Sequence, residues 1–320
     1  MCSCNLLMSN QLLKIKWKNE LAPFDTNRFA IHSGRAEIKI ARGECFAKQN
    51  VSNHTSDQRN IMLQQFHTAK ELFLTDWKIY RPLLKDKIID NAIWVTCSIF
   101  VNAYLLPKFG INPMYGIFAF AGMLASAGMF EGYASIVNLV GDLIGGKVTY
   151  YYATLPLPTW LMFTRLILSN ASLYMILTFT YIPLGKLLLY NRLDLGAIHW
   201  LQMIIIVVVS SLFYGAFNLF TTSFIDGFEH IGSVWARFIF PLWFLGGFAF
   251  SWAVLYETTP TFAYIDLLNP ILYISEAFRV ALMGQPGFLN FWLCITMICV
   301  FGVAIGWIGI ERLKKRCDFI

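Results

Sequence analysis

A glycine-rich stretch at residues 141–147 has the spacing of a phosphate-binding loop: one glycine, four residues, a second glycine and a lysine. In such loops, backbone N–H groups hold nucleotide phosphates, and a Ser or Thr hydroxyl after the lysine binds magnesium. Val148 occupies the position of that hydroxyl, and an apolar segment precedes the stretch where an α/β domain would have a buried strand. We therefore expect this chain to bind no ATP and no other cofactor itself.

Catalytic and metal-binding patterns are equally weak. The 5 histidines are scattered, and the 7 cysteines form no CxxC pair. The chain contains neither an HExxH helix motif nor a GxSxG nucleophile elbow. The sequence thus predicts a protein that is not an enzyme and holds no metal.

One carboxylate, Glu131, lies inside an apolar segment. An unpaired charge at such a depth costs about 2.5 to 3.5 kcal/mol on insertion scales. Arg165, early in the next apolar segment, is a reachable partner, so we expect an intramembrane pair between Glu131 and Arg165. The pair would line a translocation route or lock two spans together. A purely structural ion pair, or a protonated Glu131 facing a neighbouring helix, is the alternative.

The composition indicates which kind of secondary structure carries these residues. Hydrophobic residues make up 57% of the 320 residues and charged residues 14%, against about 25% charged in an average globular chain. The apolar runs do not alternate with polar residues as barrel strands do. We predict an all-α integral membrane protein whose six transmembrane helices lie at residues 88–106, 113–141, 161–185, 197–224, 234–255 and 288–310.

Three regions are expected along the chain. Residues 1–61 are predicted to have little fixed structure, and Met62 is a plausible natural start. Residues 62–87 predict an amphipathic helix at the membrane surface, with basic residues facing anionic lipid of the bilayer, bent near its end by Pro82. Its apolar stripe consists of Met62, Phe66, Ala69, Phe73, Trp77, Tyr80 and Leu84. Residues 88–320 form the six-span domain, in which Gly246 and Gly247 predict a helix break within the fifth span.

Charge placement predicts the orientation. The net charge of +6 is concentrated beside the spans, which argues against a nucleic-acid partner. Most Lys and Arg flank the spans on one side, and the positive-inside rule assigns that side and both termini to the cytoplasm of a multi-pass cell-membrane protein. Residues 142–160 then lie inside and residues 269–284 outside.

The segment at residues 269–284 predicts a short helix before the last span. Asn269 is a good N-cap, Pro270 suits the first turn, and Gly284 ends the pattern. Glu276 and Arg279 are three residues apart and can form an exposed pair. The helix is too short to span a bilayer, so we expect it to lie against the outer leaflet.

This segment, with Asn-Pro, an aromatic residue, a Glu-Ala pair, Arg and Gly, resembles the one before the last span of the type-2 ABC exporter permeases. The order of features over residues 66–316 is similar to that family. The resemblance implies a homodimer, or a dimer with a similar permease, that pairs with two copies of a separate ABC ATPase subunit. ATP and magnesium would bind that partner, and a drug, lipid or glycan would be exported by alternating access.

The resemblance also implies roles for two groups of residues. The inner loop would form the coupling helix that docks on the ATPase, through Asp142, Gly145, Gly146, Lys147 and Tyr151. The outer helix would form a gate, through Asn269, Pro270, Glu276 and Arg279.

An ATP-independent channel or an ion-coupled secondary carrier is the alternative function. The scarcity of intramembrane charges and the lack of a visible inverted repeat argue against a carrier. The sequence does not distinguish drug, lipid and glycan substrates.

Overall fold

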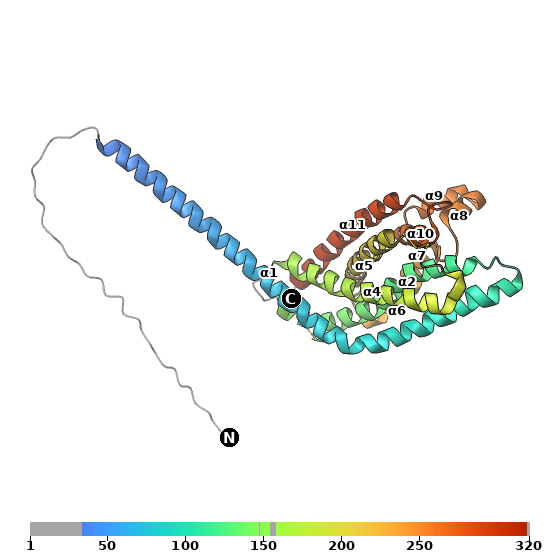
Figure 1. Ribbon diagram of the computed structural model, residues 1–320. Helices are drawn as coiled ribbons and strands as arrows, with labels where there is room; N and C mark the ends of the chain where they lie inside the picture. Colours follow the sequence, from blue (N-terminus) through green and yellow to red (C-terminus); the bar gives the residue numbers. More distant parts are fainter. Residues whose placement is uncertain (1–33, 147, 154–157, 319–320) are drawn as a thin grey trace, which may run out of the picture. The chain divides into compact units, whose positions relative to one another are not determined.

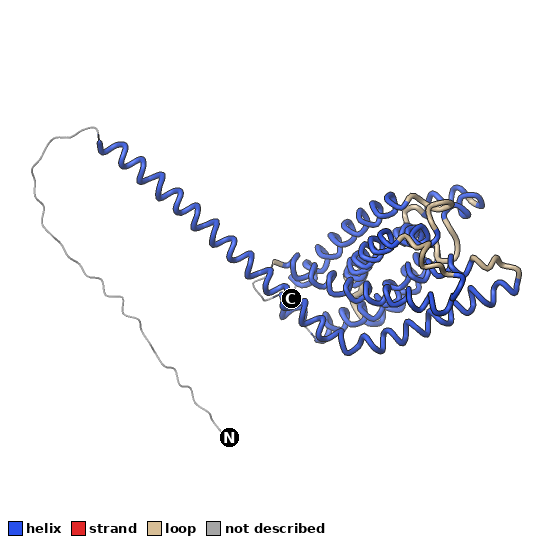
Figure 2. The backbone as a smooth tube through the Cα atoms, in the orientation of Figure 1, coloured by secondary structure: helices blue, strands red, loops and turns tan. Residues whose placement is uncertain are grey.

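The computed structural model describes the backbone of residues 34–146, 148–153 and 158–318, and every regular element in that part is a helix (Figure 1, Figure 2). The chain divides into two units, residues 1–59 and 60–320. In chain order the elements are α1 (Gly34–Ile99), π-helix η1 (Phe100–Leu105), 3-10 helix η2 (Leu106–Phe109), α2 (Tyr115–Gly141), π-helix η3 (Asp142–Gly146), α3 (Val148–Ala153), α4 (Thr159–Leu189), 3-10 helix η4 (Tyr190–Arg192), α5 (Trp200–Thr222), α6 (Phe228–Val234), π-helix η5 (Trp235–Ile239), α7 (Phe240–Leu245), α8 (Trp252–Thr258), α9 (Pro260–Asp266), α10 (Pro270–Met283) and α11 (Phe291–Asp318).

Among the described residues, 5 helical stretches are long and apolar enough to cross a membrane: Gln64–Phe109, Tyr115–Gly145, Thr159–Leu189, Trp200–Thr222 and Phe291–Arg316. At 1.5 Å per residue, each reaches across about 30 Å of hydrocarbon. The all-helical fold class is confirmed, and these helices are compatible with a multi-pass membrane protein.

The N-terminal helix differs from its prediction. We expected separate elements at residues 62–87 and 88–106, but α1 runs without a break through Pro82 and onward to Ile99. Residues 34–61, where little fixed structure was expected, also belong to α1; residues 1–33 lie outside the described part. Part of the predicted apolar stripe packs inward, since Tyr80 and Leu84 contact the core.

The predicted span at residues 234–255 is not one helix. Helical turns α6, η5 and α7 occupy residues 228–245, and the chain then leaves the helix before α8 starts at Trp252. The predicted break at Gly246 and Gly247 is confirmed. Gly247 has φ +73°, and a Cβ there would lie 3.0 Å from Leu272 Cδ1, so the turn needs a glycine at this position.

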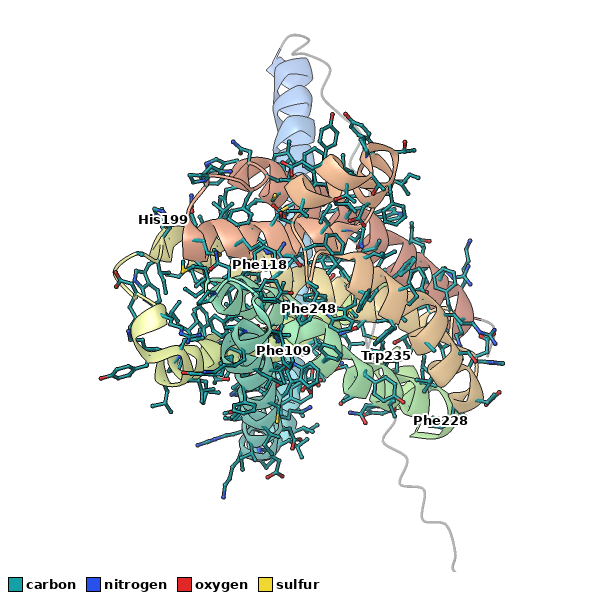
Figure 3. All side chains as sticks on the ribbon, turned by 90° about the vertical axis from the view of Figure 1, so that its right-hand side faces the viewer. Phe109, Phe118, His199, Phe228, Trp235 and Phe248 are labelled. Carbon is teal, nitrogen blue, oxygen red and sulfur yellow. The ribbon has the colours of Figure 1, made fainter. Side chains whose placement is uncertain are left out.

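The run at residues 228–245 follows α2 antiparallel along its length. Figure 3 labels Phe228, Trp235 and Phe248, which succeed one another across the molecule. Their α2 neighbours run in the reverse order, with Phe228 beside Gly141, Trp235 against Tyr133, Trp243 on Ser126 and Phe248 beside Gly122. The segment therefore passes from one end of α2 to the other.

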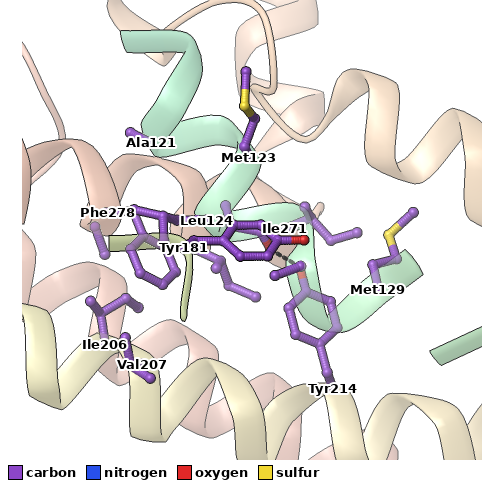
Figure 4. Packing of buried hydrophobic residues seen from close by; sticks show 14 of the residues in the cluster. Ala121, Met123, Leu124, Met129, Tyr181, Ile206, Val207, Tyr214, Ile271 and Phe278 are labelled. Atoms are coloured by element: carbon purple, nitrogen blue, oxygen red, sulfur yellow. Dashed lines mark hydrogen bonds between the residues drawn. The ribbon is translucent and has the colours of Figure 1, made fainter. Parts of the chain in front are cut away.

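The core is centred on α2, which packs against α4, α5 and α10, while α11 packs on α5. Close approach is possible because α2 carries glycines where neighbours touch it; a Cβ at Gly128 would lie 2.5 Å from the Tyr214 ring. The Tyr214 hydroxyl donates a hydrogen bond of 2.6 Å to the Ala125 carbonyl (Figure 4). Large side chains from α4, α5 and α10 fill the remaining space, including Tyr181, Ile206 and Phe278.

Candidate functional site

The inner loop is folded rather than extended. It consists of η3 followed by α3. The Asp142 carboxylate accepts a hydrogen bond of 2.7 Å from the backbone N–H of Thr149 and another from the Thr149 hydroxyl. Gly145 lies in open space. Lys147 lies outside the described residues, and only the backbone of Gly146 is described.

Tyr151 is an exposed aromatic side chain of this loop. It is 64% exposed, and its ring lies 6.0 Å from that of Tyr152. The Arg165 guanidinium in turn lies 4.8 Å from the Tyr152 ring, in cation–π geometry. The loop therefore presents aromatic surface outward while its other side contacts the beginning of α4.

The predicted pair between Glu131 and Arg165 is not formed. Glu131 makes an ion pair with Lys87 of α1. Arg165 donates to the Asp76 carboxylate at 3.2 Å, and the Ser169 hydroxyl donates to the same carboxylate at 2.7 Å. The prediction considered only the spans after residue 88 and ignored the charges of α1, which supplies both partners.

These contacts belong to a larger line of polar contacts that the sequence analysis missed, here called the polar seam. Besides the two ion pairs, the Tyr80 hydroxyl donates to Asn170 Oδ1 at 3.1 Å, and the Tyr181 hydroxyl donates to Asn91 Oδ1 at 2.7 Å. The α1 members fall within about 60° on a helical wheel at 100° per residue. That angular clustering was the signal available in the sequence. The polar seam comprises Asp76, Tyr80, Lys87 and Asn91 of α1, Glu131 of α2, and Arg165, Ser169, Asn170 and Tyr181 of α4.

The predicted outer helix forms, but its environment differs from the prediction. Asn269 caps it, since its Oδ1 accepts from the N–H of Ile271 at 3.1 Å, and Pro270 opens the first turn. However, the helix is enclosed by other parts of the protein, and Glu276 and Arg279 are both 0% exposed. The pair at 3.1 Å is buried, so the prediction of an exposed pair is wrong.

The buried charges of α10 hold the turn at residues 246–251. Arg279 donates to the carbonyls of Gly247 and Phe248, and Ser275 donates to that of Gly246 at 2.7 Å. Ser275, Glu276 and Arg279 are called the turn clamp below. Ser275 and Arg279 thereby supply donors to carbonyls at and just after the end of α7 that would otherwise have none.

Glu276 extends the turn clamp to two further elements. Its Oε1 accepts from the backbone N–H of Trp252, at the start of α8, and its Oε2 accepts from that of Leu289, each at 3.1 Å. Leu289 lies just before α11. One carboxylate thus joins the start of α8 and the segment before α11 to the middle of α10.

The electrostatics of the clamp favour a fixed ion pair. Burial lowers the pKa of Arg279 to about 10, and the Glu276 charge opposes that shift. The guanidinium also lies 3.8 Å from the centre of the Phe118 ring of α2, which is labelled near Phe248 in Figure 3. At neutral pH, Arg279 remains charged and balances Glu276.

The turn clamp and the polar seam are hydrogen bonds and ion pairs that join helices to one another. Within that part of the chain, no group of three or more His, Cys, Asp or Glu side chains is placed to hold a metal ion. Searches of protein-family models and of curated proteins found no match to this chain.

Proposed function

We propose that this chain is the membrane-spanning permease subunit of an ATP-driven ABC exporter of the type-2 class. Two such chains, or one with a similar permease, would associate with two copies of a separate ATPase subunit and move a drug, lipid or glycan outward by alternating access. The observation that carries the proposal is α10, a capped helix buried directly before the last span and tied by the turn clamp to the ends of α7, α8 and α11. A helix in this position couples an outer turn to the spans around it.

The proposal includes six crossings rather than five. The run at residues 228–245 is about 27 Å long at 1.5 Å per residue, and its contacts follow α2 from Gly141 to Ser126. A segment that accompanies a spanning helix over this length supports a sixth crossing. With six crossings both termini lie on the same side, and the basic flanks favour the cytoplasm of the cell membrane.

The inner loop is the proposed contact for the ATPase subunit. Its support is the exposed ring of Tyr151 on a short helix held by the bonds between Asp142 and Thr149. Tyrosines suit such a contact because they bury large area and keep a hydroxyl for the wet rim.

The test compares two tyrosine variants. Tyr151→Ala removes the proposed contact, where a well-packed tyrosine contributes about 2 kcal/mol or about a thirtyfold change in affinity. Tyr264→Ala is the matched control, because Tyr264 is 58% exposed in α9 and also packs against one neighbouring tyrosine. Each chain is purified from its native membrane, and co-purifying proteins are identified by mass spectrometry.

We expect an ABC ATPase with the wild type and with Tyr264→Ala, and much less with Tyr151→Ala. The absence of any ATPase from the wild-type preparation, or equal loss with both variants, would contradict the proposal.

One observation favours the ion-coupled carrier as a second candidate. The polar seam places two ion pairs between apolar helices, which is more charge than the sequence predicted. Such groups can relay protons in transporters. Reconstituted vesicles separate the two functions: transport that requires ATP and the ATPase supports the exporter, whereas transport by the chain alone under a proton gradient supports the carrier.

A further inference from the structure

An apolar groove of ≈ 660 Å³ lies between α1, α4 and α5. Its walls are almost entirely hydrocarbon, contributed by Phe66 and Phe73 of α1, Leu168 and Met175 of α4, and Val208 and Leu212 of α5. Several of these side chains are exposed, Phe66 by 51% and Leu168 by 46%. Groove walls of this kind suit a flexible hydrocarbon chain better than a polar solute.

The groove is shorter than the full hydrocarbon core of a bilayer. Its lining follows α4 from Trp160 to Met175, which is about 22 Å at 1.5 Å per residue. The hydrocarbon core of a bilayer is about 30 Å thick, so the groove has the reach of a single acyl chain rather than of the whole membrane.

One end of the groove carries a cation. Asp76 meets Arg165 and Tyr80 meets Asn170, so α1 and α4 run in the same direction with a fixed register. That register places Lys70 level with Trp160, and both line the groove. A lysine beside an indole is the usual combination at the boundary between headgroups and hydrocarbon.

The neighbouring charges leave Lys70 as the cation for a ligand. Arg165, the other cation that lines the groove, is balanced by Asp76. Lys70 makes no ion pair with the side chains that the structure describes. Glu71, the adjacent acid on α1, is exposed and does not line the groove.

We propose that this groove binds one anionic phospholipid, with an acyl chain between α1, α4 and α5 and the headgroup phosphate at Lys70. The lipid would fill the space between the bundle and the part of α1 that precedes Asp76, the first α1 member of the polar seam. This site does not depend on the transport function proposed above.

The first test blocks the groove. Val208→Trp and Thr164→Trp each place an indole in it, and both positions line it. Val300→Trp is the control, because Val300 is exposed on α11 and lines no groove described here. Native mass spectrometry of the full chain, released from nanodiscs that contain equal amounts of phosphatidylglycerol and phosphatidylcholine, counts the lipids that remain bound.

We expect one tightly retained phospholipid on the wild type and on Val300→Trp, and loss of that lipid from both groove variants. Retention by folded Val208→Trp and Thr164→Trp would overturn the proposal. Folding is checked by elution in size-exclusion chromatography.

The second test concerns the headgroup and leaves the groove open. Lys70→Gln removes the charge, and Lys78→Gln is the control, since Lys78 is exposed on the same helix and does not line the groove. We expect the wild type to prefer phosphatidylglycerol about fivefold, the value for one basic residue near an anionic headgroup. Lys70→Gln should abolish that preference and Lys78→Gln should keep it. No preference in the wild type, or equal effects of the two variants, would overturn the headgroup assignment, even if the groove variants failed to fold.

Discussion

Replacing Arg279 with alanine tests the turn clamp directly. The guanidinium is fully buried, pairs with Glu276 at 3.1 Å and donates to the carbonyls of Gly247 and Phe248. Arg279→Ala would leave Glu276 as a buried charge without its cation and remove the donors of both carbonyls.

The magnitude follows from burial. Removing one partner of a buried ion pair costs about 3 to 5 kcal/mol, and each carbonyl left without a donor adds about 1 kcal/mol or more unless water enters. An exposed pair at the same helical spacing would contribute only about 0.2 to 0.5 kcal/mol. A buried pair and an exposed pair in α10 therefore predict losses of unfolding free energy that differ about tenfold.

The assay is reversible unfolding in mixed detergent and SDS micelles, followed by circular dichroism. Arg81→Ala is the control, because Arg81 is exposed on α1. The double variant Glu276→Gln with Arg279→Met should be less destabilised than the sum of its single variants, since no buried charge remains unpaired. A loss below about 0.5 kcal/mol for Arg279→Ala would refute the buried clamp, because that is the range of an exposed pair.

Three further outcomes are expected. Gly247→Ala should destabilise the protein by more than Gly110→Ala, because both glycines have positive φ but only Gly247 has neighbours within reach of a Cβ. The unfolding midpoints of the two variants test this. Equal losses would mean that only the backbone strain of about 1 to 2 kcal/mol contributes. Burial raises the pKa of Asp266 to about 6, from 3.8, so the protonated carboxyl favours the folded state. The free energy of unfolding of the wild type should therefore fall by up to about 3 kcal/mol as pH rises from about 4 to above 6. Asp266→Asn should reduce this pH dependence when unfolding is measured across the same range. Lys87→Met should destabilise the protein by about 1 to 3 kcal/mol because it leaves the partly buried carboxylate of Glu131 without its cation. Adding Glu131→Gln should restore much of the lost stability in the same unfolding assay. If stability is not restored, the unpaired charge is not the cause of the loss.

Local signals in the sequence predicted local structure well. The N-cap at Asn269, the proline at the first turn and the end before Gly284 are all as expected, because each depends on backbone groups a few residues away. The break at Gly246 and Gly247 was equally accessible, since the positive φ at Gly247 favours glycine. Long apolar runs identified most of the helices that could span a membrane, because length and apolar composition are also local properties of the sequence.

Environment was much harder to predict than local structure. Spacing shows that Glu276 and Arg279 share a helix face, but it does not show what covers that face, and a charged pair on a short helix is usually exposed. The partners of Glu131 and Arg165 were misassigned because the charges of α1 were interpreted as facing lipid headgroups. In the structure, Lys87 and Asp76 face α2 and α4 instead.

The glycines of α2 fix its axial position. A Cβ at Gly122, Gly128 or Gly132 would lie 2.6 Å or less from Phe248, Tyr214 or Asn218. A shift of α2 along its axis by one turn, about 5.4 Å, would bring Phe118 or Ser126 to the point where Gly122 contacts Phe248, and the volume of those side chains opposes it. We therefore expect α2, α5 and the turn at residues 246–251 to move together. Relative movement of helices is then expected at other contacts, such as the hydrogen-bonded boundary between α1 and α4.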